Sequence, residues 1–394
     1  MKKIYNILAM MLMAITATGL SSCVYESYEE PESQNKTDEM IWVRLNVSSL
    51  NPLSELSDNT REPLYSIRAV IIDEDGIVEY NQKEVFESPV NSYYFNALVK
   101  AGKKKFYFIA NAETMTLYES GNPNTESAFF NRFPVGSTGF EAAVNSLYYL
   151  NTYYDTDTNP IPLSSSYEME TQPGIQDLQF WLVRAATKYT VHFENSRSAS
   201  VQLNDLYVSQ LADQMYIMPQ VGSSQQTISN KYWIDWLREV ADKSHEPDSN
   251  QGDINFNSTH GWITDYQIPS YATPFDFYLV KGADIEIPGL QTSAGGGEPE
   301  PGTKDLGPFY STEGKNLLTS ASGGTQQYTI HIKLTDNKDQ KEFSEYRILP
   351  NLSALFRNTH VIINITFDES YMHVYGEIAD WDEHTTYGDL TEEK

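Results

Sequence analysis

Alternation of apolar and polar residues with a period of two dominates this chain of 394 residues and restricts its fold more than any other feature. Residues 41–48 are the clearest example, with every second residue apolar: Ile41, Val43, Leu45 and Val47. Side chains of a strand point alternately to the two faces of a sheet, so this pattern predicts one half-buried strand. The same alternation identifies strands in the rest of the chain.

Further strand patterns recur along the chain, at residues 66–72, 77–80, 93–100, 105–110, 176–193, 201–208, 327–334, 342–349, 359–367 and 371–381. Asp75-Gly76 predicts a hairpin turn. Residues 101–103 predict a second hairpin, with the lysines that begin at Lys103 on an edge or turn. Helical periodicity is confined to short windows at 140–150 and 228–241.

No repeat of short fixed period is present, which disfavours a propeller or solenoid. The length gives a prior of two domains. We therefore predict an all-β fold with minor helices, built as two tandem β-sandwich domains over residues 41–190 and 191–394. A stretch rich in Asp, Asn, Ser, Gly and Pro predicts a flexible insertion at 245–308.

The charge balance excludes one class of partner. The chain has 27 Lys and Arg residues and 54 Asp and Glu residues, so its formal net charge is −27. Because this charge repels a phosphate backbone, we predict that the protein has no nucleic-acid partner. The single cysteine, Cys23, rules out an intrachain disulfide and a cysteine-based metal site.

The first residues have the layout of a lipoprotein signal peptide, predicted at 1–22. Two lysines precede an apolar run from Ile7 to Leu20, which is shorter than the roughly 20 residues that a spanning helix needs. Residues 20–23, Leu-Ser-Ser-Cys, resemble the lipobox of bacterial lipoproteins, which implies a lipid on Cys23 and attachment to the outer membrane. The acidic residues 23–40 then read as a solvated tether.

Catalytic and metal-binding patterns are weak. None of the seven histidines has the spacing of a metal-binding helix, no G-x-S-x-G elbow is present, and a neighbouring carboxylate pair such as Asp380 and Asp382 arises readily among 54 acids. We predict no enzyme activity, no metal and no cofactor besides the covalent lipid. Trp233 and Trp236 would be the better candidates for an exposed sugar platform, while Trp42, Trp181 and Trp381 are expected in strands, as core or sandwich-edge residues.

Four segments in order resemble one family, the Bacteroidetes fimbrillins, which are type V pilin-like lipoproteins. These segments are SIRAVIIDEDGIV, AGKKKFYFIANAE, FWLVRAATKYTVHF and LFRNTHVIINITF with VYGEIADW, and they span residues 66–381. The resemblance implies transthyretin-like sandwich domains, a place in the surface fimbrium, a role in cell adhesion, and other fimbrial subunits as partners, copies of this chain included.

The resemblance also implies donor-strand exchange, in which an Arg- or Lys-specific protease removes the first strand and a neighbouring subunit fills the groove. The removable strand would be 41–48, and the cleavage site Arg61, with an uncleaved loop arginine as the alternative. The donor would be 371–381 or the strand with the stronger apolar comb, Val361, Ile363, Ile365 and Phe367. Shaft, anchor and tip subunits all stay open.

Two rival functions share these features. A surface glycan-binding lipoprotein would keep both termini and expose an aromatic platform, whereas a hydrolase would need paired carboxylates in a cleft of the second domain.

Overall fold

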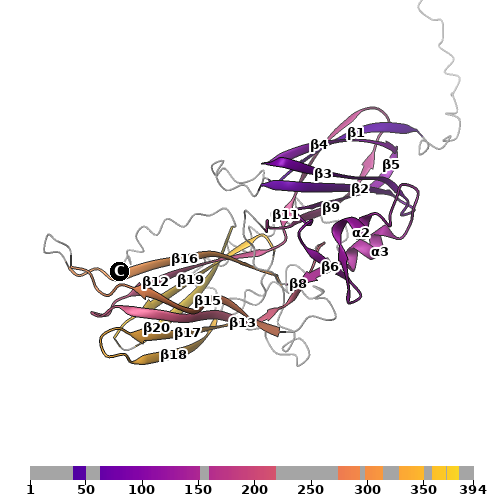
Figure 1. The fold of residues 1–394 in the computed structure, drawn as a ribbon. Helices are drawn as coiled ribbons and strands as arrows, with labels where there is room; N and C mark the ends of the chain where they lie inside the picture. Colours follow the sequence, from indigo (N-terminus) through magenta and orange to yellow (C-terminus); the bar gives the residue numbers. More distant parts are fainter. Residues whose placement is uncertain are drawn as a thin grey trace, which may run out of the picture. The chain divides into compact units, whose positions relative to one another are not determined.

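The computed structural model describes residues 39–49, 63–150, 159–218, 274–292, 298–313, 328–349, 357–369 and 371–380. Its elements are almost all strands, with two short helices, α2 (Glu126–Phe130) and α3 (Phe140–Asn145). The all-β fold class is therefore confirmed (Figure 1). Within the described residues, no helix is long and apolar enough to cross a membrane.

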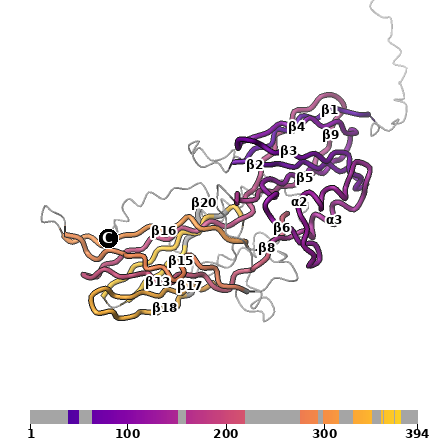
Figure 2. The backbone as a smooth tube through the Cα atoms, viewed as in Figure 1, coloured from indigo at the N-terminus to yellow at the C-terminus, as the bar shows by residue number. Residues whose placement is uncertain are grey.

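The first sandwich packs a three-stranded sheet on a five-stranded one (Figure 2). The smaller sheet has the order β10-β1-β4 and consists of β10 (Gln176–Trp181), β1 (Met40–Ser48) and β4 (Ser92–Lys100). The larger has the order β11-β9-β5-β2-β3 and consists of β11 (Val183–Arg184), β9 (Leu163–Thr171), β5 (Gly102–Ala110), β2 (Leu64–Asp73) and β3 (Val78–Val90).

Strand β2 shows why the larger sheet lies in the middle of three layers. Its residues are buried on both faces, because Ile67, Ala69 and Ile71 enter the core shared with β1, while Val70 and Ile72 enter a second core on the opposite face. Strands covered on both sides read as near-continuous apolar runs. The second core is covered by α2, α3 and a small sheet of order β14-β8-β6-β7, made of β14 (Gln214–Tyr216), β8 (Tyr148–Leu150), β6 (Thr116–Glu119) and β7 (Asn122–Thr125).

The second sandwich packs two four-stranded sheets around its own core. One has the order β16-β12-β19-β20 and consists of β16 (Gly302–Ser311), β12 (Thr187–Asn195), β19 (Thr359–Phe367) and β20 (Met372–Asp380). The other has the order β15-β13-β17-β18 and consists of β15 (Pro274–Ile287), β13 (Val201–Ala212), β17 (Tyr328–Asp336) and β18 (Glu342–Leu349). The predicted domain boundary at 190/191 falls inside β12 and stays a prediction.

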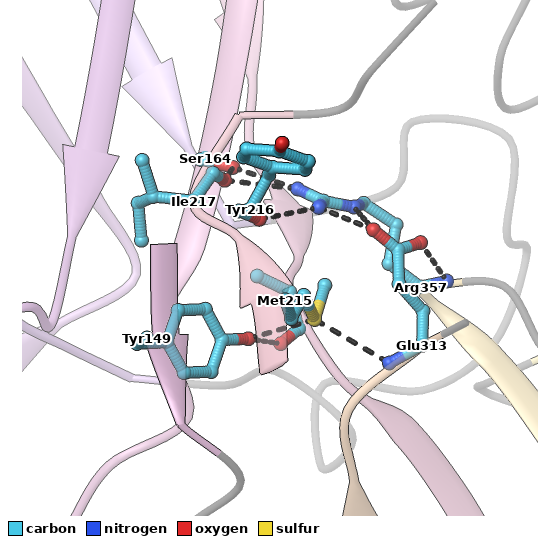
Figure 3. A network of polar contacts seen from close by, with 8 residues as sticks. Tyr149, Ser164, Met215, Tyr216, Ile217, Glu313 and Arg357 are labelled. Carbon is cyan, nitrogen blue, oxygen red and sulfur yellow. Dashed lines mark hydrogen bonds and ion pairs between the residues drawn. The ribbon is translucent and has the colours of Figure 1, made fainter. Parts of the chain in front are cut away.

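The buried side chain of Arg357 links the two sandwiches through hydrogen bonds (Figure 3). Arg357, which precedes β19, is fully buried and forms an ion pair with Glu313, just after β16. The same guanidinium donates hydrogen bonds to the Ser164 hydroxyl on β9 at 3.1 Å and to the carbonyls of Tyr216 at 2.8 Å and Ile217 at 2.9 Å. Arg357 thus satisfies groups from both halves of the chain.

Three local predictions were wrong. Residues 93–100 and 105–110 do not form a hairpin, because the chain crosses from one sheet to the other at Ala101, so that β4 pairs with β1 and β5 with β2 and β9. The lysines lie in the interior strand β5 rather than on an edge, and the nearly buried Lys104 pairs with Glu79 at 3.1 Å. The helix expected at 140–150 ends at Asn145, where the chain turns into β8.

The predicted insertion at 245–308 needs a correction too. Strand β15 and most of β16 lie inside this range, and both form ladders with the framework strands β13 and β12. Phe277 and Ile287 of β15 are buried in the core. The polar residues between the two strands hid the apolar positions of β15 in the sequence. The hairpin turn at 73–76 is confirmed, and Gly76 has the positive φ of 77° that this turn requires.

Candidate strand-exchange site

Strand β1 occupies the middle of its sheet, between two strands that have no other neighbour in that sheet among the described residues. It pairs antiparallel with β4 from Met40↔Lys100 to Ser48↔Ser92, and parallel with β10 from Val43↔Gln176 to Ser48↔Trp181. Removal of β1 would therefore leave a slot one strand wide. Both borders of the slot would then expose unpaired backbone N–H and C=O groups.

The inward face of β1 carries the four predicted groove residues. Ile41, Val43, Leu45 and Val47 are all at most 2% exposed, and they belong to the core between the two sheets. Full burial of such a side chain contributes roughly 1.5–3 kcal/mol, so the four together contribute about 6–12 kcal/mol, an upper figure because unfolded chains already bury some surface. That sum rivals the whole stability of an ordinary domain, about 5–15 kcal/mol.

Strand β10, one border of the slot, is held by contacts that do not involve β1. The ring of Phe180 packs against Phe106, Phe108 and Tyr167 of the larger sheet, with centroids 5.2, 4.8 and 4.8 Å apart. The Tyr167 hydroxyl accepts a hydrogen bond from the Trp181 amide at 2.9 Å and donates one to the Trp181 carbonyl at 2.8 Å. These contacts tie β10 to β9 across the sandwich.

Strand β4, the other border, is tied to the larger sheet as well. The rings of Tyr93 and Phe95 pack against Phe86 and Tyr80 of β3, with centroids 5.2 and 6.2 Å apart. Burial, together with the neighbouring Tyr93 and Glu84, raises the pKa of Tyr80 to about 12, so this phenol stays neutral at physiological pH. Thr171 donates a hydrogen bond to the Gly102 carbonyl at 2.9 Å, where β4 crosses into β5.

The predicted cleavage site lies outside the described residues. Arg61 belongs to the segment 50–62, between the end of β1 and the start of β2. Before that segment, the Ser49 amide donates to the Asn91 carbonyl at 3.1 Å, so the first part of the connection still follows β4. Cys23 and residues 1–38 also lie outside the described part of the chain.

The two predicted donor strands occupy different positions in the second sandwich. Strand β19 carries the buried comb Val361, Ile363, Ile365 and Phe367, and it lies between β12 and β20. Among the described strands, β20 lies at the sheet edge and pairs with β19 alone. Release of β20 would break one ladder, whereas release of β19 would break two.

The predicted residues are thus placed in two separate cores, the groove set in the first sandwich and the comb in the second. Sequence reasoning missed the side chains that hold the slot's borders. Phe180 could have been found from its place in an apolar run, but Tyr167 lies among serines and acids, and Thr171 among polar residues, without a periodic signal.

Two observations on the described residues bear on the rival site types. Within these residues, no group of three or more His, Cys, Asp or Glu side chains could hold a metal ion. Trp42 was expected as core or sandwich edge, but it is 54% exposed on a central strand. Trp233 and Trp236 lie outside the described residues, so the sugar platform stays a prediction.

Comparisons with known proteins give structural neighbours only. No protein-family model and no curated protein matches the chain. The tip fimbrial protein Mfa3 of Porphyromonas gingivalis is 14% identical, with a TM-score of 0.43, 87% of this chain covered and 100% of that one. A candidate cell adhesion protein of Parabacteroides distasonis is 9% identical, with a TM-score of 0.49, 86% of this chain covered and 96% of that one. A fimbrilin of Porphyromonas gingivalis is 10% identical, with a TM-score of 0.37, 86% of this chain covered and 97% of that one.

Proposed function

We propose that this chain is a fimbrial subunit that exchanges β1 for a strand of a neighbouring subunit and supports cell adhesion from the bacterial surface. The observation that carries this proposal is the position of β1 in the middle of a sheet whose outer strands are anchored elsewhere. A sheet built in this way keeps its slot when the middle strand leaves, and an alternating strand restores both the ladders and the four apolar contacts.

The route to that state begins at the outer membrane. A signal peptide at 1–22 would be removed and Cys23 acylated, so that the chain is delivered as a lipoprotein. An Arg- or Lys-specific protease would then cut after Arg61, which frees β1 together with the lipid. The role requires no catalytic residue and no cofactor besides that lipid.

We propose β20 as the donated strand. Its position at the sheet edge means that it can leave with the loss of one ladder, and Met372 is a buried residue that it would withdraw from the core. The partner is another fimbrial subunit. The comb of β19 stays in place and closes the second sandwich.

Limited digestion of residues 24–394 with an Arg-specific protease tests the proposal. We expect a cut that leaves Glu62 as the new amino terminus, followed by a ladder of oligomers on size analysis. Arg61→Gln is the matched control and should remain monomeric. Among the described arginines, Arg132, exposed in the turn after α2, is the main competing site, so Arg132→Gln should leave the oligomers unchanged.

A synthetic peptide of residues 371–381 identifies the donor. Added during digestion, it should occupy the slot and suppress the oligomers, while a peptide of residues 359–367 should do so less. A complete cut after Arg61 with no release of β1, even when peptide is in excess, would contradict strand exchange in this chain.

A further inference from the structure

The outward face of the β10-β1-β4 sheet is divided into an apolar and a polar end. At the polar end, Arg44 lies 3.4 Å from Asp177, and Asn46 donates a hydrogen bond to Gln179 at 2.5 Å. Tyr94, paired with Asn46, is the exposed ring at this end. At the other end, the side chains on the same face are large and apolar. We call this second group the apolar end, and it consists of Met40, Trp42, Leu98 and Ile175.

The register of the strands brings these four side chains together. Trp42 is paired directly with Leu98 across the ladder, and Ile175 comes just before Gln176, the partner of Val43. Met40, Trp42, Leu98 and Ile175 are 51%, 54%, 41% and 81% exposed. Single exposed apolar residues are ordinary, but a contiguous group on one face indicates a contact surface.

The place of the apolar end in the chain indicates its occupant. Met40 begins β1, and only 16 residues separate it from Cys23, the proposed lipid site. A random coil of 16 residues would have a root-mean-square span of about 20–24 Å. A lipid on Cys23 would therefore hold the apolar end near the bilayer, at an effective concentration on the order of millimolar.

The chemistry of the apolar end fits a membrane surface. Tryptophan is enriched at the headgroup level, where an apolar ring with one polar N–H is favoured. The net charge of −27 opposes anionic lipid, so a zwitterionic headgroup layer is the matching surface.

We propose that the apolar end rests on a zwitterionic membrane surface while the chain is lipidated and intact. The inference rests on the proposed lipidation of Cys23. This face would not form a contact between assembled subunits, since strand exchange would carry Met40 and Trp42 away with β1. The surface therefore exists only at the membrane-bound stage, and cleavage removes both the lipid and half of this contact.

The single cysteine makes a direct test possible. Residues 23–394 are coupled at Cys23 to a maleimide with one acyl chain, which by itself gives only weak, reversible binding of about 10⁴ M⁻¹. Partition into phosphatidylcholine vesicles is then measured for the parent, for Trp42→Gln with Leu98→Gln, and for a matched control, Arg44→Gln with Asn96→Gln, two exposed residues that are paired at the polar end. Thermal unfolding verifies that each variant folds.

We expect the apolar-end variant to lose about tenfold in partition, equivalent to about 1.4 kcal/mol, and the control to change less than twofold. Equal partition of the two folded variants would overturn the proposal. So would concentration-dependent self-association of the parent without vesicles that disappears in the apolar-end variant, because the occupant would then be a second copy. Strand exchange after Arg61 cleavage is measured separately and would survive either result.

Discussion

Truncation of Leu45 tests the proposed exchange through the energy that holds β1 in place. Leu45 is fully buried between the sheets, so Leu45→Ala should cost about 2–5 kcal/mol of the free energy of unfolding, from lost transfer energy and the cavity left behind. Arg44→Ala is the control on the same strand, because its ion pair with Asp177 is largely exposed and is worth at most about 1 kcal/mol. Urea unfolding of residues 24–394 measures both.

The same substitution should act on the cut chain. Loss of 2–5 kcal/mol from the hold on β1 shifts its displacement by a donor peptide by about 30-fold to several thousandfold, since each 1.4 kcal/mol is tenfold. Release of a fluorophore attached at Cys23, in a chain of residues 23–394, measures that displacement after cleavage. If Leu45→Ala destabilises the chain but leaves the displacement equilibrium unchanged, β1 is not the strand that exchanges. An unchanged urea midpoint would refute the burial argument itself.

Three further predictions concern the framework. Burial alone would raise the pKa of Glu126, but hydrogen bonds from Arg68 and Lys83 lower the pKa overall. The ionised carboxylate therefore stabilises the fold at a pH above its ordinary pKa, and this stabilisation is lost as the pH falls through the lowered pKa. Glu126→Gln should flatten the acid side of a plot of the urea midpoint against pH. Arg357→Met should cost about 3–5 kcal/mol in the same assay, because Glu313 would remain as a buried charge without its partner. Gly76→Val should lower the thermal midpoint by several degrees, since valine at a φ of 77° costs about 1–2 kcal/mol.

Strand existence could be predicted from the sequence because it depends on local alternation. The pattern at 41–48 places four side chains on one face wherever the strand is packed, and the runs at 342–349 and 359–367 agree with the structure to the residue. The buried groove residues of β1 could be predicted for the same reason. Their burial follows from period two alone.

Strand pairing depends on tertiary context, and there the sequence was a poorer guide. A short Gly-containing connection between two strand patterns normally predicts a hairpin, yet at Ala101 the buried strands on each side belong to different sheets. Lys104 belongs to a run of lysines that is typical of an exposed edge, but its side chain is nearly buried beside Glu79. No local sequence pattern indicates that these two residues are in contact. Tyr167 holds a border of the slot through one hydroxyl, which no periodicity can indicate.

The central position of β1 also gives the proposed cleavage its physical role. A new strand can be added beside a strand at a sheet edge, but a strand in the middle of a sheet can only be replaced. A donor strand can therefore enter only if β1 first loses the advantage of being covalently joined to the same chain. While β1 and β2 remain joined through residues 50–62, β1 competes at an effective concentration on the order of millimolar, which a dilute partner cannot match. After a cut in that segment, β1 dissociates into solution and the two strands compete on affinity alone. Cleavage then acts without altering any contact in the slot, which is why the borders formed by β4 and β10 have to be secured from the opposite sheet.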